Sequence, residues 1–201
     1  MQEIETWNIA NGVLEYIDET HTYLFNGEIL PSITQILRVK FGNKYNGISE
    51  EVLKRASELG TNMHQMIQDY EEHNIDYVGD IELRNYKFLK KYHKWEVERC
   101  EVPIVLIIDD KPIGAGRLDL LVKKDGKLGI LDLKRTSSFD RDYVAYQTNL
   151  YRLGFKNTYN QEIEFVGGIH LREDKRKYYE LPINEELAMS LVNEYLEMEN
   201  K

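Results

Sequence analysis

The sequence predicts an α/β fold in which a mixed central sheet is flanked by helices. Helical and strand-like segments alternate along the 201 residues, and three strand-like segments follow one another in the second half. Apolar residues make up 42% of the chain and charged residues 30%, which is the composition of an ordinary folded protein rather than a disordered one. This order of elements is typical of a sheet that is covered by helices.

The length of the chain predicts a single domain. At roughly 150 residues per domain, 201 residues correspond to one domain with an elaborated edge. No repeat, low-complexity tract or flexible linker divides the sequence. We therefore expect one domain over residues 1–201 with three parts, which are an N-terminal hairpin and short helix at 1–48, a helical part at 49–98 and a catalytic sheet core at 99–201.

The composition also excludes several kinds of protein. A single cysteine, Cys100, excludes a disulfide framework and a multi-cysteine zinc or iron–sulfur site. No apolar run approaches about 18 residues, so no membrane span is expected. The N-terminus lacks a basic stretch followed by an apolar one, so no secretory signal is expected, and a reducing cytoplasm is the expected location.

The balance of charge bears on the partners. The chain holds 35 acidic against 26 basic residues, which gives a net charge of −9. Such a balance argues against nonspecific coating of nucleic acid. It does not exclude a nucleic-acid enzyme, because a metal site gathers acids while basic residues can cluster elsewhere.

The first half of the chain predicts short strands and then helices. Asn-Gly turns at 11–12 and 26–27 separate the strands of the first thirty residues. Ser32 is expected to cap a short helix, and Ser49 precedes a longer helix that runs to about His73. A second long helix is expected from Asp80 to Glu98. The apolar positions that define the two long helices are Val52, Leu59, Met63, Ile67 and Tyr70 for the first, and Ile81, Phe88, Tyr92 and Trp95 for the second.

The second half predicts the sheet. Strands are expected at 102–108, 114–122, 128–134, 163–171 and 177–181. A helix at 140–154 is expected to end on Gly154, and a terminal helix at 184–198 is expected to be capped by Asn184.

The hairpin at 114–138 carries the strongest candidate chemistry. Asp125-Gly126 is typical of a two-residue hairpin turn, and a turn centred there places Asp119 opposite Asp132. Because side chains alternate along a strand, Lys134 lies on the same face as Asp132. The same alternation predicts one shared face for Arg117, Asp119 and Leu121, and the opposite face for Leu118, Leu120 and Val122.

Two interpretations of this hairpin remain open from the residues alone. Directly opposed carboxylates destabilise a pair of strands unless a cation lies between them. In the first interpretation, Lys134 neutralises Asp132 on a solvated face. In the second, Asp119 and Asp132 bind Mg²⁺ or Mn²⁺, which prefer oxygen ligands. A divalent ion beside a lysine suits hydrolysis of a phosphodiester.

Four motifs resemble those of the PD-(D/E)XK nuclease superfamily, in particular its RecB-like exonuclease branch, which includes phage recombination exonucleases. The motifs are Gly60-Thr61-Asn62-Met63-His64, Gly116-Arg117-Leu118-Asp119, Asp132-Leu133-Lys134, and Gln147 with Tyr151. The stretch HTYLFNGEILPSITQIL also resembles the N-termini of phage-encoded members, so the likeness covers residues 20–151. It implies a restriction-endonuclease-like αβββαβ core and a metal-dependent DNA nuclease, more often an exonuclease than an endonuclease, in phage or bacterial recombination or repair.

The resemblance also implies roles for individual residues. Asp119, Asp132 and the carbonyl of Leu133 would bind Mg²⁺ or Mn²⁺, His64 would complete the metal site, and Lys134 would be catalytic. The bacterial cytoplasm would be the location if the chain is phage-encoded. The cysteines that hold an iron–sulfur cluster in some relatives are absent here.

Further along, Gln147 and Tyr151 would face the DNA or the site. Arg135 stands where the family often has Thr or Ser. Taken without the resemblance, His64 is more typical of a packed or surface histidine, and Gln147 of a residue at the rim of a packed tyrosine. Glu101 begins the first central strand and could support the site as a neighbouring acid, but it is interpreted as a surface residue.

Three basic clusters are candidates for contact with DNA. Each has an ordinary alternative as a solvated surface, and phosphate contacts would make binding salt-dependent. No residue pattern in the sequence indicates recognition of particular bases, so we expect sequence-tolerant binding of single strands or duplex ends. The clusters are Lys87, Lys90, Lys91 and Lys94 on one helix; Arg38, Lys40 and Lys44 with Phe41 and Tyr45; and Arg172, Lys175, Arg176 and Lys177.

A non-enzymatic function is the competing hypothesis. A nuclease fold can serve as a DNA- or protein-binding module without cleavage, for example as a phage counter-defence factor. The intact pair of acids with a lysine argues against it, since a binding module has no need of opposed carboxylates. A homo-oligomer or a recombination partner protein is compatible with either function.

Overall fold

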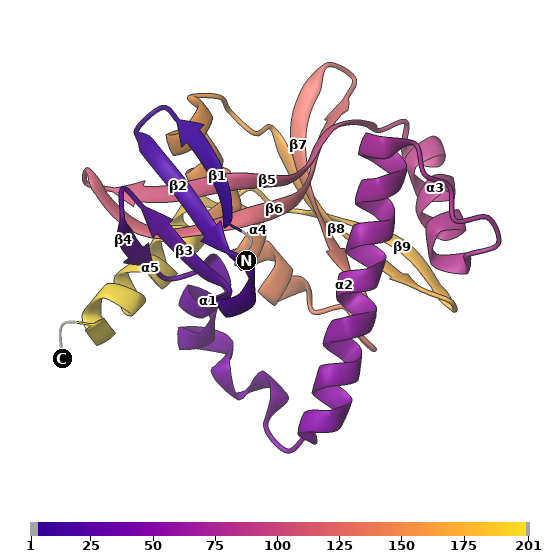
Figure 1. Ribbon diagram of the computed structural model, residues 1–201, viewed down its shortest axis with the longest axis horizontal. Helices are drawn as coiled ribbons and strands as arrows, with labels where there is room; N and C mark the ends of the chain where they lie inside the picture. The colour runs from indigo at the N-terminus through magenta and orange to yellow at the C-terminus, as the bar shows by residue number, and fades with distance from the viewer. Residues whose placement is uncertain (1–3, 200–201) are drawn as a thin grey trace.

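The computed structural model describes residues 4–199 and contains two β-sheets and five α-helices (Figure 1). The strands are β1 (Ile4–Ile9), β2 (Gly12–Ile17), β3 (Thr22–Phe25), β4 (Glu28–Leu30), β5 (Glu96–Ile108), β6 (Lys111–Lys124), β7 (Lys127–Lys134), β8 (Phe165–Arg172) and β9 (Lys175–Leu181). The α-helices are α1 (Ile33–Phe41), α2 (Glu50–His73), α3 (Ile81–His93), α4 (Arg141–Tyr159) and α5 (Glu185–Glu199). Two short 3₁₀ helices are η1 (Asp18–Thr20) and η2 (Gly42–Tyr45).

The larger sheet is mixed and forms the centre of the molecule. Its strand order is β5-β6-β7-β8-β9. Strands β7 and β8 are parallel and are connected through α4, whereas the other neighbours are antiparallel. The α/β class and the mixed sheet flanked by helices are therefore confirmed. The order α3, β5, β6, β7, α4, β8 follows the expected αβββαβ sequence of elements.

Helices cover both faces of the central sheet. On one face α1, α4 and α5 pack against the strands through a core that includes Ile36, Leu150 and Leu191. On the other face α2 and α3 pack through a second core that includes Met63, Ile67 and Leu83 (Figure 1).

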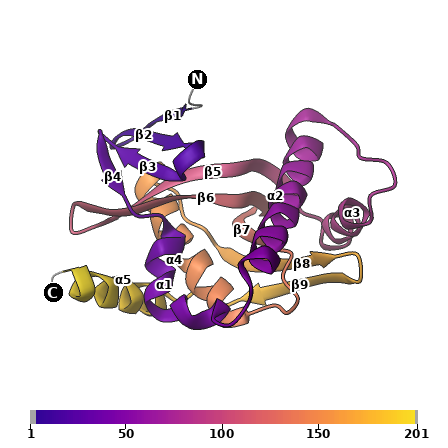
Figure 2. The same ribbon diagram turned by 60° about the horizontal axis from the view of Figure 1, so that its bottom comes forward.

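The four N-terminal strands form a separate antiparallel sheet in the order β1-β2-β3-β4. Leu14 and Phe25 of this sheet pack against Val105 of β5 and Ala115 of β6, so the small sheet lies over one end of the large one (Figure 2). The predicted turn at 26–27 is confirmed, because Phe25 of β3 pairs with Glu28 of β4 across it.

Polar side chains cap α1, α4 and α5, whereas Ser49 at the start of α2 forms no capping hydrogen bond through its side chain. Ser32 forms a capping box with Gln35, in which each side chain bonds the backbone N–H of the other residue. The carboxylate of Asp140 accepts from the N–H of Tyr143, and the side chain of Asn184 accepts from the N–H of Leu187. The predicted caps Ser32 and Asn184 are confirmed.

Helix α3 differs from the prediction. It ends at His93, because Lys94 adopts a left-handed conformation and Trp95 turns into the core; the prediction that the helix continues to Glu98 was wrong. The prediction of its apolar face was also wrong. The helix packs through the buried residues Leu83, Tyr86 and Leu89, while Ile81, Phe88 and Tyr92 are exposed.

Two further helices differ from the prediction, α2 in its buried residues and α4 in its C-terminal end. Helix α2 buries Met63 and Ile67, but Val52 is 57% exposed because the first turns of α2 extend beyond the sheet (Figure 1). Helix α4 continues past Gly154 to Tyr159, so this glycine is not a helix end. A Cβ at Gly154 would lie 2.5 Å from Ile104 Cδ1, so the glycine allows α4 to approach β5.

Over residues 4–199, no helix combines the length and the apolar character that crossing a membrane requires.

Candidate metal centre

The predicted register of the central hairpin is confirmed over its paired residues. Strands β6 and β7 pair from Lys124↔Lys127 to Leu120↔Leu131. Asp119 and Asp132 therefore follow directly after the last pair. At this point the Oδ2 atom of Asp119 accepts a hydrogen bond of 2.6 Å from the backbone N–H of Leu133, which fixes the carboxylate.

A third acid, Glu101, lies on β5 across from Asp119. The pairs Cys100↔Leu120 and Val102↔Leu118 flank it on either side. Glu101 has φ 46°, which is a left-handed conformation that a non-glycine residue rarely adopts. Such a conformation costs on the order of 1–3 kcal/mol and persists where the surroundings impose it, often at functional sites.

The unusual backbone at Glu101 coincides with a switch of faces. Cys100 and Leu120 pack into the core beneath α2 and α3, whereas Val102 and Leu118 pack into the core beneath α1 and α4. The prediction that Leu118 and Leu120 share a face was therefore wrong, because regular alternation stops at this position in both strands.

His64 of α2 completes a group with the two acids. Its Nδ1 atom lies 3.6 Å from Oδ1 of Asp119 and 3.7 Å from Oε1 of Glu101. Its Nε2 atom lies 3.2 Å from the carbonyl oxygen of Leu133. Ligand atoms of His64, Glu101 and Asp119 all lie within 4.8 Å of one another, so these three side chains can hold one metal ion.

Asp132 and Lys134 lie beside this group as an ion pair. The Nζ atom of Lys134 is 2.6 Å from Oδ2 of Asp132. Asp132 is only 1% exposed, so the alternative of a solvated face does not hold for it. Its Oδ2 atom is held by Lys134, whereas its Oδ1 atom has no hydrogen-bond partner among the described residues. Buried carboxylate oxygens of this kind need a cation or a donor.

The acids at the site resist ionisation. Burial raises the pKa of Asp132 to about 6, and the charge of Asp119 adds to this effect while Lys134 opposes it. Burial also raises the pKa of Asp119, although His64 and Lys134 act to lower it. The cations near these two carboxylates therefore do not fully compensate for the cost of burying their negative charge.

The bases at the site are held in their charged forms. Burial acts to lower the pKa of His64, but the carboxylates of Asp119 and Glu101 outweigh it and raise the pKa to about 9. Burial likewise opposes the charge on Lys134, and Asp132 and Asp119 outweigh it and raise its pKa.

This set of donors fits a divalent cation. Carboxylates and a backbone carbonyl are the hard oxygen ligands that Mg²⁺ and Mn²⁺ prefer. The imidazole of His64 favours Mn²⁺ over Mg²⁺. The Oδ1 atom of buried Asp132 has no hydrogen-bond partner among the described residues and is available to a cation. Of the expected ligands, the structure brings His64, Asp119 and Leu133 together with Glu101, and it places Asp132 next to them in the pair with Lys134.

Gln147 and Tyr151 lie on one face of α4 near this site. The Nε2 atom of Gln147 donates to the hydroxyl of Tyr151 at 3.3 Å. The Oε1 atom of Gln147 is buried and has no hydrogen-bond partner among the described residues. Burial raises the pKa of Tyr151 well above its usual value, and the charge of Asp119 adds to the effect.

Arg135 has a structural partner that accounts for its presence after the lysine. Its Nε atom lies 2.8 Å and 3.0 Å from the two carboxylate oxygens of Glu82 at the start of α3. Both side chains are largely buried. The pair therefore anchors the end of β7 to α3, directly beside the candidate metal centre.

Two lysines of the predicted basic cluster on α3 form ion pairs with acidic residues. Lys87 pairs with Asp76 at 2.5 Å, and Lys90 pairs with Glu71 at 2.6 Å. Lys91 is exposed on the helix, and Lys94 is its C-terminal cap.

Basic residues of the other two predicted clusters form ion pairs with acids or lie over aromatic rings. Lys44 pairs with Asp140, and Lys40 lies over the ring of Tyr146. Arg172 and Lys175 both approach Asp174. Arg176 lies over the ring of Phe88 at 3.8 Å, and Lys177 lies over Tyr179. The side chain of Tyr45 lies outside what the structure describes.

The interpretation of Glu101 as a surface residue was wrong, because its carboxylate is 24% exposed and lies in the group with His64 and Asp119. A signal was available, since Glu101 directly precedes the apolar run that begins at Val102. A pairing of that strand with the one holding Asp119 would have brought the two acids together. The left-handed backbone of Glu101 has no local signal of the kind that glycine or asparagine would give.

The comparisons with known proteins leave the function open. No protein-family model matches the chain, and no curated protein matches it. Solved structures do match, among them the crystal structure of a protein named SSO0001. That match has 16% sequence identity and a TM-score of 0.47, and it covers 83% of this chain and 75% of the other. A similarity of this level carries no argument about activity.

Proposed function

We propose that this chain is a deoxyribonuclease that uses Mg²⁺ or Mn²⁺ to hydrolyse phosphodiester bonds, and more specifically an exonuclease of phage or bacterial recombination or repair. The observation that carries the proposal is the gathering of His64, Glu101 and Asp119 beside the buried pair of Asp132 and Lys134. The resemblance of the four motifs to the RecB-like branch supplies the exonuclease assignment and the biological context.

Each residue of the centre has a role in this proposal. Asp119, Glu101, His64 and the carbonyl of Leu133 would hold the cation. When bound, a divalent ion supplies an acidified water and offsets charge that develops on a phosphoryl oxygen. The hydrogen bond from Leu133 N–H holds Asp119 so that its other oxygen faces His64.

Lys134 is the group that would act on the substrate. Asp132 holds its ammonium in place, and the nearby carboxylates keep it protonated. From that position the ammonium would orient the attacking water and offset phosphate charge. The free Oε1 of Gln147 would accept a hydrogen bond at the rim of the site.

The test is a cleavage assay on labelled single-stranded and double-stranded DNA with Mn²⁺, Mg²⁺ or EDTA. We expect cleavage with either metal and none in EDTA. Removing a positioned catalytic group typically lowers rates by about 10²–10⁴-fold, so Asp132→Ala and Lys134→Ala should lose activity on that scale. Lys127→Ala, at the exposed tip of the same hairpin, is the control and should retain activity.

Two results would overturn the proposal. One is the absence of metal-dependent cleavage by the folded wild-type protein on both forms of DNA, which would favour the binding-module alternative. The other is metal-dependent cleavage that persists in Asp132→Ala. Circular dichroism of each variant separates loss of activity from loss of fold.

A further inference from the structure

Two aromatic rings lie open to solvent on the outer face of α3. Phe88 is 47% exposed and Tyr92 is 71% exposed, although phenylalanine is among the residues that proteins most often bury. The two residues are one helical turn apart and their rings stack, with centroids 6.0 Å apart and an angle of 10° between the planes. Contiguous apolar surface that is left exposed commonly marks a site where another molecule binds.

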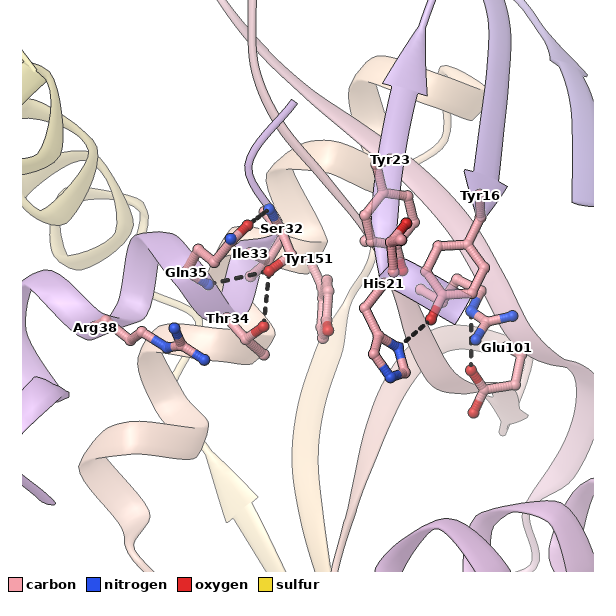
Figure 3. A pocket seen from close by; sticks show the side chains of 13 residues that line it. Tyr16, His21, Tyr23, Ser32, Ile33, Thr34, Gln35, Arg38, Glu101 and Tyr151 are labelled. Carbon is pink, nitrogen blue, oxygen red and sulfur yellow. Dashed lines mark hydrogen bonds and ion pairs between the residues drawn. The ribbon is translucent and has the colours of Figure 1, made fainter. Parts of the chain in front are cut away.

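The tyrosines of the cavity beside the metal centre are not open in this way. That cavity has a volume of about 500 Å³, lies between the N-terminal sheet and α1, and is lined by Tyr16 and Tyr23 (Figure 3). Their side chains are only 4% and 8% exposed, and the guanidinium of Arg117 covers the ring of Tyr16 at 4.4 Å. The rings of α3 are therefore the ones on which a planar ligand can stack.

Three cations surround the exposed rings of α3. Arg84 and Lys91 lie four residues before and three residues after Phe88, so the three share one face of the helix. At a rise of 1.5 Å per residue, the two cations are roughly 10 Å apart along the helix axis. Helix α3 packs against β8 and β9, and Arg176 of the edge strand β9 lies with its guanidinium 3.8 Å from the centre of the Phe88 ring (Figure 2). The aromatic patch is defined here as Arg84, Phe88, Lys91, Tyr92 and Arg176.

Neighbouring acids do not neutralise the positive charge of the aromatic patch. Within residues 4–199, Arg84, Lys91 and Arg176 form no ion pair with a carboxylate, whereas Lys87 and Lys90 of the same helix are both paired. This local excess of cations stands against a net charge of −9 for the whole chain. The patch therefore complements a ligand that is both anionic and aromatic.

Single-stranded DNA has both of these properties. Bases stack on exposed aromatic side chains with little regard to sequence, and basic groups beside the rings contact the phosphates. A guanidinium such as that of Arg176 can also stack on a planar ring. In a duplex, stacked neighbours cover the faces of the bases, so a single strand presents the open faces that the rings require. An acidic peptide would match the cations but supplies no base for the rings.

We propose that the aromatic patch binds single-stranded DNA outside the metal centre, with bases stacked on its two rings and phosphates at its three cations. No residue of the patch belongs to the metal-ligand group or lines the cavity beside it. Helix α2, which carries His64, lies between α3 and the small sheet (Figure 2). The inference goes beyond the proposed nuclease function, since it assigns a second contact with a DNA strand and requires no cleavage.

A binding measurement without metal tests this inference. Fluorescence anisotropy in EDTA compares a labelled oligothymidylate, an abasic strand of the same length and polyglutamate. We expect oligothymidylate to bind at least five-fold more tightly than the abasic strand, because base stacking contributes to affinity, and to bind more weakly as salt is added. Absence of oligothymidylate binding, or an abasic strand bound as tightly, would overturn the inference. Polyglutamate bound as tightly as oligothymidylate would also overturn it and would favour an acidic protein as the partner.

Variants locate the binding on the aromatic patch. Tyr92→Ala should weaken oligothymidylate at least five-fold and leave the abasic strand unchanged, whereas Lys91→Ala should weaken both strands and reduce the dependence on salt. Tyr77→Ala is the control for the ring, because Tyr77 is 43% exposed and its hydroxyl donates to Asp69. Lys127→Ala is the control for the charge, at the exposed tip of the central hairpin. Equal oligothymidylate affinities of Tyr92→Ala and wild type would contradict the assignment.

The proposal for the aromatic patch and the nuclease proposal fail separately. Oligothymidylate binding that depends on Tyr92, without metal-dependent cleavage by the wild type, would support the patch and remove the nuclease proposal. Metal-dependent cleavage, with oligothymidylate binding that is the same in Tyr92→Ala and wild type, would remove the patch and leave the nuclease proposal intact. Circular dichroism of each variant separates loss of binding from loss of fold.

Discussion

Three carboxylates lie close together at the metal centre, and two of them are nearly removed from water. Asp132 is 1% exposed and Asp119 is 9% exposed. Burial of charged groups is costly unless they are paired. His64 and Lys134 supply part of the compensation through contacts with these acids. A divalent cation would displace the proton of His64, because a ligating imidazole is neutral, and would supply the charge that these acids require, which is the physical reason to expect metal binding here.

Glu101 gives a direct test at the level of single residues. We expect Glu101→Gln to weaken Mn²⁺ binding at least ten-fold, because the variant loses one negative oxygen ligand. Isothermal titration with MnCl₂ measures the change. Glu98→Gln is the control, since Glu98 lies on the same strand but pairs with Lys123 away from the cluster. Equal Mn²⁺ affinities for Glu101→Gln and wild type would contradict the role of Glu101.

The position of a site residue could be predicted from the sequence where residues close to it in the chain determine that position. The hairpin register, which leaves Asp119 and Asp132 directly after the last pair, followed from an Asp-Gly turn that lies within twenty residues of both acids. The position of Glu101 depends on a left-handed backbone inside a strand and on a contact with His64 of α2. No local pattern encodes either feature.

At the level of elements, the close approach of α4 to the sheet limits the size of the side chains that the middle of this helix can hold. A Cβ at Gly154 would lie 2.5 Å from Cδ1 and 3.2 Å from Cγ1 of Ile104, which is fully buried. The same glycine has the sequence signature of a helix end, which explains the wrong boundary. The neighbour on β5 that requires it lies 50 residues away in the sequence.

We expect Gly154→Ala to destabilise the protein by about 1–2 kcal/mol. Alanine is favoured over glycine within a helix by about 1 kcal/mol, but overpacking of a core costs about 1–3 kcal/mol. Gly60→Ala in α2 is the matched control, because a Cβ there meets nothing within 4 Å, and it should stabilise by up to about 1 kcal/mol. Urea unfolding measures both variants, and a stabilised Gly154→Ala would contradict the packing.

The cap of α4 gives a prediction for the dependence of stability on pH. Burial acts to raise the pKa of Asp140, but hydrogen bonds from Lys44 and from the N–H of Tyr143 outweigh it and lower the pKa below the ordinary aspartate value of 3.8. Stabilisation from a carboxyl with a lowered pKa is present above its unfolded-state pKa and is lost as the pH falls through the folded-state pKa. The cap should therefore weaken only below pH 3.8.

Substitution of the cap tests this dependence. Asp140→Ala should lower stability by about 1 kcal/mol at neutral pH, and the difference from wild type should shrink below pH 3.8. Urea unfolding at a series of pH values measures it. Asp140→Asn keeps a side-chain acceptor without the charge and is the control. A difference between Asp140→Ala and wild type that stays constant into the acid range would contradict the contribution of the carboxylate.

At the level of the whole molecule, the site is assembled from both sheets and from helices on both faces of the large one. His64 comes from α2, the acids from β5 to β7, and the walls of the cavity from the small sheet and α1. The order of elements was predictable because each has its own periodicity and caps. The packing of the small sheet over β5 and β6, and the cavity that results, were not, because they depend on contacts between distant segments.

The most direct test of the central claim is a crystal structure of the protein soaked in MnCl₂, with anomalous diffraction recorded near the manganese edge. We predict an anomalous peak within about 2.0–2.3 Å of Asp119 and of at least two further ligand atoms from His64, Glu101, Asp132 and the Leu133 carbonyl. Well-ordered side chains at this position without an anomalous peak, in crystals that bind manganese elsewhere or not at all, would contradict the account.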